Sequence, residues 1–577
     1  MKPVLTFEEL RNAIIGQNFM FQTPYGKRLL LYADYTASGR SIKFIEQFLI
    51  KIQREYANTH TEDDVTGRQM TKILHQAELT IKKAFNGEEN CQIIATGTGA
   101  TGAISKFQEI IGIRLPPATK ELMKTLLNKS AKDNVLEQNL NNTLEKEINR
   151  LKPVVFIGPY EHHSNDIMWR EAIAEVITIQ LTSEGYLDIG DLERQVSDPK
   201  YKNRLKIGSF SAASNVTGLK APIYEISRIL HKHGCIVCFD FAASAPYVKV
   251  DMNNDRDTFF DAIFISPHKF VGGPGSSGIL VFNKRVYKSA LPPTSSGGGT
   301  VDFVSSTSVD YSEDIETREK TGTPGVLQTI KAALAIDLKD AIGIENIEAK
   351  ELEYTTRALD RLSKHPKIEI LGPLDPENRI SIVSFMIKHE DKYLHPKFTT
   401  KLLNDLFGIQ SRAGCMCAGP YGHLLLNIDE ERSQKFRCIT QQGKLGFKPG
   451  WCRVNFHYLC SENEFEFICK TIEFVADYGY LFLNEYSFAV HSGDWTHLHF
   501  KDTNLINNLD IKSILSSDLR NCFDEESIDR NAEFTKYLND ANKIVKSFNE
   551  SKEYKQFDDP EVEELRWFNF LHLNKQN

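Results

Sequence analysis

Two residues in the middle of the chain have side chains suited to the chemistry of a carbonyl cofactor. Asp240 ends the apolar run CIVCFD, and Lys269 follows closely after the apolar run AIFIS. Both runs predict buried strands, and an open α/β sheet binds its ligands beyond the carboxyl ends of the strands. A lysine can form a Schiff base with a carbonyl group, and an aspartate can keep a pyridine nitrogen protonated. The pair is consistent with pyridoxal phosphate, but a lysine and an aspartate at solvated strand ends also occur without such chemistry.

Three further passages after predicted strands carry side chains suited to the same cofactor. In IIATGTGATGAIS, residues 93–105, backbone N–H groups and the Thr101 hydroxyl could bind a phosphate, or the passage could be a plain strand-to-helix turn. His162, in YEHHSN after the run KPVVFIG, could stack on a cofactor ring and exchange protons, or lie on the surface. Asn215, in ASNVTG, could hydrogen-bond a ring oxygen or only start a turn.

The order of these passages resembles that of the class V aminotransferase superfamily, and within it the cysteine desulfurase and selenocysteine lyase group. The resemblance spans Asp34 to about Tyr458. The matching motifs, in the family's order, are Tyr32-Ala33-Asp34-Tyr35-Thr36-Ala37, Gly99-Ala100-Thr101, Glu161-His162-His163-Ser164-Asn165, Ser214-Asn215-Val216-Thr217-Gly218, Asp240-Phe241-Ala242-Ala243, Ser266-Pro267-His268-Lys269, Gly322-Thr323-Pro324, Arg412-Ala413-Gly414 through Cys417-Ala418, and Arg453-Val454-Asn455-Phe456. Nine modest motifs in one order make a chance match very improbable.

The resemblance implies a role for each matching residue. Lys269 would form the Schiff base with pyridoxal phosphate, Asp240 would pair with its pyridine nitrogen, and His162 would stack on its ring. Asn215 would lie near the ring hydroxyl, and Arg453 would bind the substrate carboxylate, a bidentate task that suits arginine. The phosphate would be held by Ala100, Thr101, Ser266, His268 and, from the other subunit of a homodimer, Thr323.

The passage Arg412-Ala413-Gly414-Cys415-Met416-Cys417-Ala418-Gly419-Pro420 bears on the type of reaction. It is similar to the loop that carries the sulfur-accepting cysteine of one class of desulfurases, and Cys417 falls on that position. A thiolate is the reactive form of a cysteine, and Arg412 could help to form it. Arg412 is also a candidate substrate-binding residue, together with Arg453. A sulfur-acceptor protein could dock near this loop. Cys417 could also be an accidental loop cysteine, and Cys415 could relay sulfur or be incidental.

The other cysteine spacing of note is Cys235-x-x-Cys238. It lies inside an apolar run, with no second such pair and no histidine at metal-binding spacing, so we interpret it as two buried strand thiols. The sequence predicts no metal site.

Three positions depart from the family's pattern. Ala243 replaces the glutamine that usually follows the ring-nitrogen aspartate, Lys320 stands where glutamate is common, and Asn455 where serine is common. Three functions therefore remain open. The first is a desulfurase-like lyase or sulfurtransferase that forms a persulfide on Cys417 and releases alanine. The second is an aminotransferase, epimerase or β-eliminating lyase for another amino acid, with Cys417 dispensable. The third is a non-catalytic protein that has kept the fold.

The elements that would position these residues alternate between strands and helices. The predicted strands are 152–157, 205–211, 235–241, 261–266 and 278–282; helices are expected at 223–234 and from about 324. This order predicts an α/β, fold-type-I pyridoxal phosphate enzyme with a mostly parallel sheet, helices on both faces and a smaller α+β domain. We expect a large domain at 31–330, with a helical insertion at 115–151 carrying Leu136, Leu140, Leu144 and Ile148. The small domain is expected at 1–30 and 331–489, followed by an extension at 490–577.

Composition limits the remaining classes. The 577 residues carry 69 Lys and Arg against 77 Asp and Glu, a net charge of −8, with 41% hydrophobic and 25% charged residues and 10 cysteines. This is the composition of a globular protein with a large core and no disulfide scaffold. The mildly acidic balance argues against nucleic acid as a partner. No apolar run is long enough to span a membrane, and the N-terminus does not resemble a targeting segment, so we expect a cytoplasmic enzyme.

Overall fold

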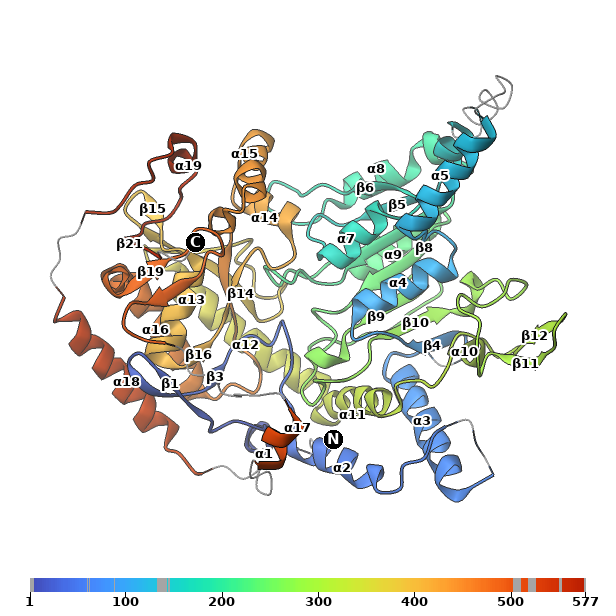
Figure 1. Cartoon of the computed structure of the whole chain (residues 1–577), viewed down its shortest axis with the longest axis horizontal. Coiled ribbons are helices and arrows are strands. Elements are labelled where there is room, and N and C mark those ends of the chain that lie inside the picture. The colour runs from blue at the N-terminus through green and yellow to red at the C-terminus, as the bar shows by residue number, and fades with distance from the viewer. Residues whose placement is uncertain are drawn as a thin grey trace. The chain divides into compact units, whose positions relative to one another are not determined.

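The computed structural model describes residues 5–59, 61, 63–87, 89–131, 143, 146–501, 510–516, 526–548 and 553–574. The chain forms two compact units. The central unit comprises Ile45–Ser214 and Lys220–Ile344, and the C-terminal unit comprises Met1–Phe44, Asn215–Leu219 and Glu345–Asn577. Each unit has its own sheets and helices (Figure 1).

A seven-stranded sheet organises the central unit. Its strands, in spatial order, are β4 (Cys91–Ala95), β10 (Ile279–Asn283), β9 (Ala262–Ile265), β8 (Ile236–Asp240), β7 (Lys206–Ser211), β5 (Val154–Ile157) and β6 (Glu175–Thr178). The run from β9 to β6 is parallel, and β10 is antiparallel to both of its neighbours. The five strands predicted from the sequence all lie in this sheet, within about two residues of the expected bounds. They read as continuous apolar runs because their side chains are buried on both faces.

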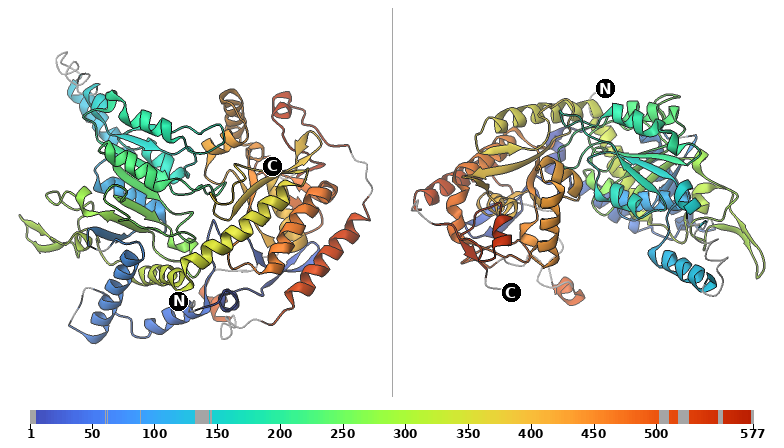
Figure 2. Two further views of the ribbon diagram at one scale, coloured as in Figure 1. Left: turned by 180° about the vertical axis from the view of Figure 1, so that it is seen from behind. Right: turned by 90° about the horizontal axis from the view of Figure 1, so that it is seen from above.

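Helices pack on both faces of this sheet (Figure 2). The helices of the central unit are α2 (Lys43–Gln53), α3 (Val65–Ala84), α4 (Ala100–Ile110), α5 (Pro117–Ala131), α7 (His163–Arg170), α8 (Ile189–Ser197), α9 (Ile223–Lys232), α10 (Ile315–Arg318) and α11 (Val326–Ile342), with short 3₁₀ turns η1 (Pro199–Tyr201), η2 (Pro267–Lys269) and η3 (Lys284–Val286). On one face, Phe107 of α4 and Trp169 of α7 share a core with Ile207. On the other face, Leu230 of α9 lies against Gly208. A Cβ atom added at Gly208 would come within 2.3 Å of the Leu230 Cδ1 atom. The fold class expected from the sequence is therefore confirmed.

Two parts of the central unit extend from the sheet. Helix α5 lies at the start of the segment in which we expected a helical insertion, and Ile148 is exposed. The expected helix positions Leu136, Leu140 and Leu144 lie outside the described residues. The second part is a hairpin of β11 (Val301–Val304) and β12 (Val309–Tyr311).

The C-terminal unit is an α+β structure with several small sheets. The largest consists of β13 (Ile368–Ile370), β14 (Ile382–His389), β18 (Trp451–Asn455) and β17 (Arg412–Gly414), with β15 (Lys392–Tyr393) paired to β14. The others pair β1 (Met20–Thr23) with β2 (Gly26–Leu29), β16 (Ile409–Gln410) with β3 (Leu31–Tyr32), and β20 (Trp495–His497) with β19 (Tyr486–Phe488) and β21 (His572–Leu573).

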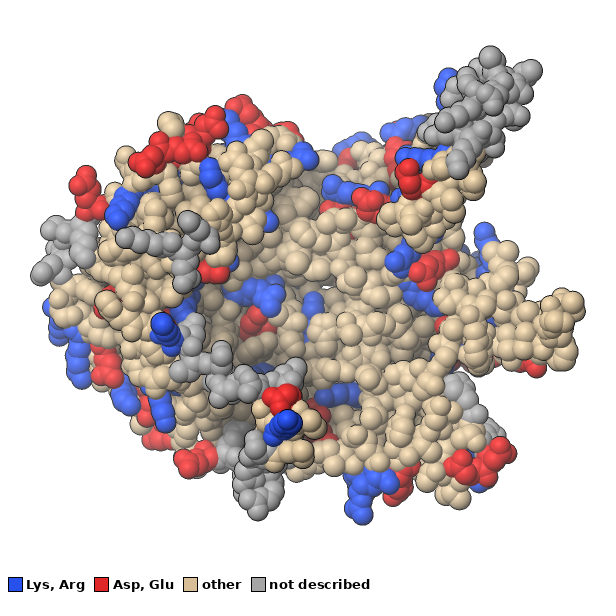
Figure 3. Space-filling model, viewed as in Figure 1, with Lys and Arg blue, Asp and Glu red and all other residues tan. Residues whose placement is uncertain are grey.

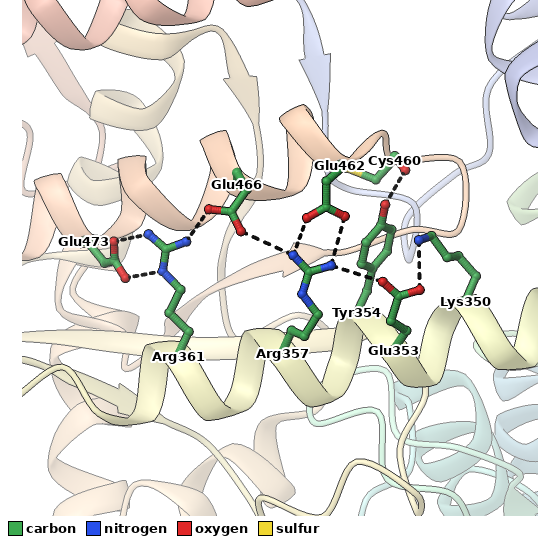
Figure 4. Close-up of polar contacts among 9 residues, drawn as sticks. All are labelled: Lys350, Glu353, Tyr354, Arg357, Arg361, Cys460, Glu462, Glu466 and Glu473. Atoms are coloured by element: carbon green, nitrogen blue, oxygen red, sulfur yellow. Dashed lines mark hydrogen bonds and ion pairs between the residues drawn. The ribbon is translucent and has the colours of Figure 1, made fainter.

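The helices of the C-terminal unit are α1 (Phe7–Ala13), α12 (Ile344–Ser363), α13 (Pro396–Phe407), α14 (Gly419–Leu425), α15 (Glu430–Gln441), α16 (Glu462–Tyr478), α17 (Ile511–Ser516), α18 (Arg530–Val545) and α19 (Pro560–Glu564), with turns η4 (Leu445–Phe447) and η5 (Gly479–Glu485). An alternating series of ion pairs joins α12 to α16 (Figure 4). Arg361 binds Glu473 through two hydrogen bonds of 2.6 and 2.5 Å and Glu466 at 2.9 Å. Arg357 binds Glu466 and Glu462.

The chain after residue 489 forms part of the core of the C-terminal unit. Phe534, Tyr537, Phe568 and Phe570 are buried in the same hydrophobic cluster as Phe398 of α13. The short strands β20 and β21 also lie in this region, which the sequence analysis describes only as an extension. Strands of two or three residues are too short to show an alternating pattern.

The surface has no large field of one sign on the face that Figure 3 shows, where basic and acidic side chains are interspersed. Within the described part of the chain, no helix has both the length and the apolar character needed to cross a membrane.

Candidate active site

Asp240 and Lys269 follow neighbouring strands of the central sheet, as expected. Asp240 is the last residue of β8, and Lys269 ends the turn η2 that comes directly after β9. The two strands are parallel, with Asp240 opposite Phe264. The Asp240 side chain is buried and accepts a hydrogen bond of 2.8 Å from the Ala242 N–H. Burial raises the pKa of this carboxyl, while that hydrogen bond and the Lys269 charge oppose the rise.

The start of α4 and the residues before Lys269 form one cradle of backbone and hydroxyl groups. The Ala100 N–H donates to Ser266 Oγ at 2.9 Å, and His268 Nδ1 donates to the Thr98 carbonyl at 2.7 Å. Burial lowers the pKa of His268. Gly99 permits this close approach, because a Cβ there would lie 2.9 Å from His268 Cε1 and 3.0 Å from Ser266 Oγ. The cradle lies at a helix N-terminus, where anions bind favourably.

Thr101 and His162 are brought together through the start of α7. Thr101 Oγ1 and Ser164 Oγ share a hydrogen bond of 2.7 Å. His162 is the N-cap of α7, and its Nδ1 accepts from the Ser164 N–H at 3.1 Å. The Nδ1 atom is therefore an acceptor, so a neutral His162 carries its proton on Nε2.

Thr323 is held differently from the other predicted phosphate residues. It is exposed just before α11, and its Oγ1 accepts a hydrogen bond from Asn58 Nδ2 at 3.4 Å. The fold thus brings together four of the predicted phosphate residues, Ala100, Thr101, Ser266 and His268. Thr323 makes a separate contact with Asn58.

Glu161 is a buried carboxyl to which the sequence alone assigned no role. It accepts hydrogen bonds from the Gly158 N–H, the Ser211 N–H, the Ser211 hydroxyl and Asn165 Nδ2, at 2.5 to 3.0 Å. Burial raises its pKa to about 7, although these donors favour the charged form. It joins the ends of β5 and β7 to the start of α7, directly beside His162. The clue in the sequence was an acidic residue next to a histidine after a fully apolar strand.

In the C-terminal unit, Arg453 and Arg412 face each other across β18 and β17, where they are direct register partners. Asp34 binds both: its Oδ1 lies 2.9 Å from Arg453 Nη2, and its Oδ2 lies 2.9 Å from Arg412 Nε. In the sequence, Asp34 stands only within a motif, and nothing local shows that it meets two distant arginines.

Asn215 belongs to the same cluster. Its Nδ2 donates to the Met416 carbonyl at 2.7 Å, and its own carbonyl accepts from Arg453 Nη1 at 2.8 Å. Its Oδ1 is buried and has no hydrogen-bond partner among the described residues. This oxygen is available to a donor from a ligand.

Cys417 is exposed in the turn between β17 and α14. Met416 and Cys417 both have positive φ angles, 52° and 57°, a strained conformation for residues with a Cβ. The turn is closed by a hydrogen bond of 3.1 Å from the Ala418 N–H to the Cys415 carbonyl. Among the described cysteines, only Cys417 and Cys438 are exposed. An exposed thiol in a strained turn is accessible for nucleophilic chemistry.

Cys235 directly precedes β8, Cys238 lies within it, and both side chains are buried. Burial raises the pKa of Cys235 to about 12 and that of Cys238 well above its usual value. The interpretation as buried strand thiols is confirmed. Within the described residues, no cluster of three or more histidine, cysteine, aspartate or glutamate side chains has an arrangement that could hold a metal ion.

The predicted residues therefore fall into two clusters, one in each unit. The central unit holds Lys269, Asp240, His162, Ala100, Thr101, Ser266, His268 and Thr323. The C-terminal unit holds Arg453, Arg412, Cys417 and Asn215.

Curated relatives resemble the chain over part of its length. It is 34% identical over 270 residues to a protein of Halalkalibacterium halodurans named "probable cysteine desulfurase", a match that covers 46% of this chain and 62% of that protein. It is 28% identical over 400 residues to a "probable cysteine desulfurase" of Staphylococcus aureus, a match that covers 68% of this chain and 84% of that protein. The chain thus spans less than two thirds of the first relative's length and most of the second's.

Solved structures share the fold. The apo structure of a cysteine desulfurase from Thermococcus onnurineus superposes with a TM-score of 0.61 at 21% identity, covering 83% of this chain and 99% of that one. The cysteine desulfurase CsdA from Escherichia coli gives a TM-score of 0.58 at 18% identity, covering 82% and 99%. The family model for class-V aminotransferases matches residues 130–465, which is more than half of the chain. The chain therefore belongs to the class-V aminotransferase family.

Proposed function

We propose that this protein is a pyridoxal phosphate-dependent cysteine desulfurase that forms a persulfide on Cys417 and releases alanine. The observation that carries the sulfur-transfer part is the exposed Cys417 thiol in a strained turn of a family member whose curated relatives bear that name. The cofactor and the sulfur acceptor are supported by separate sets of residues.

The central unit offers a donor set that fits pyridoxal phosphate. The buried Asp240 carboxylate needs a positive partner, and a protonated pyridine nitrogen would be one. The cradle of Ala100 and Ser266 at the start of α4, with the Thr101 hydroxyl, suits a phosphate group. Lys269 follows the strand beside that of Asp240, so one ligand could contact both ends. When bound, the cofactor supplies an electron sink for the pair released when a substrate Cα–H bond breaks.

The side chains of this unit would then handle protons. The Lys269 amine would take the proton from the substrate Cα and later return a proton to the product. His162 would present Nε2–H, because its Nδ1 already accepts from the Ser164 N–H. Glu161 would keep His162 in place by tying the strand before it to β7.

Arg453 and Arg412 would bind the substrate carboxylate, and the Cys417 thiolate would attack the substrate sulfur. An S–S bond forms as the substrate Cβ–S bond breaks, and the electron pair of the broken bond becomes a C–H bond after protonation. L-cysteine and the Cys417 thiol thus become L-alanine and a Cys417 persulfide. The atoms and electrons balance without an external oxidant or reductant.

The proposal extends to organisation. The central unit would be the cofactor-binding domain and the C-terminal unit the small domain, with the 490–577 segment as part of the latter. The enzyme would act in the cytoplasm as a homodimer in which Thr323 approaches the phosphate of the other subunit. The exposed Cys417 would pass its sulfur to an acceptor protein.

A second reaction is favoured by one residue. Ala243 is buried three residues after Asp240 and offers no amide to a ring hydroxyl. That change alters the electronics of the cofactor, which favours a pyridoxal phosphate enzyme that acts on another amino acid without using Cys417.

Replacement of Cys417 distinguishes the two reactions. In protein loaded with pyridoxal phosphate, Cys417→Ser should lower alanine release from L-cysteine by about 100-fold or more, because the step loses its nucleophile. Cys438→Ser removes the other exposed described thiol and should leave the rate unchanged. Full activity in Cys417→Ser would overturn the persulfide role, and a spectral change with another amino acid would then support the second reaction.

A further inference from the structure

Two arginines of the C-terminal unit occupy directly opposite positions on antiparallel strands. Arg412 of β17 is the register partner of Arg453 of β18. Like charges in directly opposite cross-strand positions destabilise a sheet. Asp34 is the counter-charge, because each of its carboxylate oxygens lies 2.9 Å from one of the two guanidinium groups. This set of three ionised side chains keeps one positive charge.

The backbone holds Asp34 in this place from both sides. The Ala33 N–H donates to the Gln410 carbonyl at 2.9 Å, two residues before Arg412, and the Asn455 N–H donates to the Ala33 carbonyl at 2.9 Å, two residues after Arg453. The residue before Asp34 is therefore bonded to both strand segments that carry the arginines. The main chain at Asp34 is therefore fixed relative to both arginines.

The two arginines differ in exposure, and this difference assigns their tasks. The Arg453 side chain is 3% exposed and binds Asp34 through Nη2 and the Asn215 carbonyl through Nη1, whereas the Arg412 side chain is 49% exposed. A buried charge that loses its partner is costly. Asp34 therefore stabilises Arg453, and the half-exposed Arg412 gives the pair of arginines its accessible contact with a further anion.

We propose that Asp34 sets the net charge of the Asp34–Arg412–Arg453 set to +1 and so makes the enzyme select amino acids with a single carboxylate over those with a second acidic group. This inference rests on the proposed function, in which these arginines bind the substrate carboxylate. One carboxylate brings the set to neutrality. A second acidic group would add an uncompensated negative charge close to Asp34.

L-asparagine and L-aspartate test this inference, because they have nearly the same size and differ by one charge. Their dissociation constants are measured by calorimetry on full-length protein loaded with pyridoxal phosphate. The unmodified protein should bind L-asparagine more tightly. In Asp34→Asn, the ratio of the L-aspartate to the L-asparagine dissociation constant should fall about tenfold, which corresponds to about 1.4 kcal/mol. A purely structural role of Asp34 would weaken both ligands and leave the ratio unchanged.

A second variant keeps the inference falsifiable if Asp34→Asn fails to fold. Arg412→Gln removes a half-exposed charge and should raise the same ratio, because the set then becomes neutral. Arg437→Gln, on the exposed side of α15, is the matched control and should not change it. An unchanged ratio in Arg412→Gln would overturn the inference, as would an unchanged ratio in a folded Asp34→Asn.

The result of this binding test can be distinguished from the result of the test of the proposed function. If both amino acids bind but Cys417→Ser keeps full activity, the desulfurase proposal fails and the charge inference stands or falls on the ratios alone. If the unmodified protein binds neither amino acid, both are overturned.

Discussion

The polar centres of the two units are assembled in different ways. In the central unit, neighbouring backbone groups fix two of the site's side chains: the Ala242 N–H holds Asp240, and the Ser164 N–H holds His162. In the C-terminal unit, Asp34 meets Arg412 and Arg453 across 378 and 419 residues of sequence. The central site depends on local contacts and on the strands of one sheet, which also bring Ala100 to Ser266 and Thr98 to His268. A centre built from distant segments depends on the packing of the whole unit.

Each unit also contains a buried glutamate whose pKa is raised, Glu161 in the central unit and Glu351 in the C-terminal unit, and their surroundings repeat this contrast. Glu161 accepts two of its hydrogen bonds from Ser211, at the end of a strand in the same parallel sheet. Glu351 of α12 accepts from the N–H groups of Ser381 and Tyr458, at 3.2 and 2.8 Å, and so joins three separate segments of the C-terminal unit. Burial raises the pKa of Glu351 to about 8.

The largest expected effect tests whether the last residues of the chain support the C-terminal unit. Phe568 is fully buried against Phe488 and His395. Phe568→Ala should lower the free energy of unfolding by about 3–5 kcal/mol, measured by denaturant titration, because it leaves a cavity in the core. Amide exchange should rise in the C-terminal unit, while strands β5 and β7 keep their protection.

Phe303→Ala is the control for this prediction, because Phe303 is 56% exposed on the β11–β12 hairpin of the central unit. Its effect should lie within about 0.5 kcal/mol. If Phe568→Ala increases exchange equally in both units, the C-terminal core is not a separate cooperative region and the contrast between the units fails.

An effect that develops gradually with pH concerns Glu351. Its pKa rises from 4.5 to about 8 on folding, so the folded state keeps a proton that the unfolded state has lost. Stability should therefore fall as the pH rises from about 4.5 to 8, by about 1.4 kcal/mol per pH unit, and level off above that. The denaturation midpoint measured across this window gives the slope.

Glu351→Gln should flatten this dependence, because the amide does not titrate. Glu161→Gln is the comparison in the central unit, where the pKa of about 7 predicts a slope that ends at lower pH. Equal pH profiles for the unmodified protein and Glu351→Gln would show that this carboxyl is ionised in the folded state.

The smallest expected effect belongs to the ion pairs between α12 and α16. Arg361 is only partly buried, with 28% of its side chain exposed, so water and salt weaken its pairs with Glu466 and Glu473. Arg361→Gln should lower the free energy of unfolding by about 1 kcal/mol or less in dilute buffer, and by less still in 1 M salt. A loss that is independent of salt would indicate that the stem of Arg361, not its charge, stabilises the helix pair.

The sheet of the central unit could be predicted closely because its strands are continuous apolar runs with polar residues at their carboxyl ends. Asp240, Lys269 and the turn around Thr101 were visible for the same reason: each follows such a run directly. Glu161 was overlooked because its four donors include Ser211, which is 50 residues away in the sequence. The short strands β20 and β21 were missed because pairing, not pattern, defines them.

The sequence by itself determined the family, the fold class and the order of the residues with cofactor chemistry, because these depend on local patterns along the chain. Only the tertiary structure decided that Asp34 binds two arginines, that Cys417 lies in a strained exposed turn, and that the chain after residue 489 completes a core. The physical reason is that charge neutralisation and burial depend on which distant segments meet. That meeting is set by the packing of the whole unit and not by any single motif.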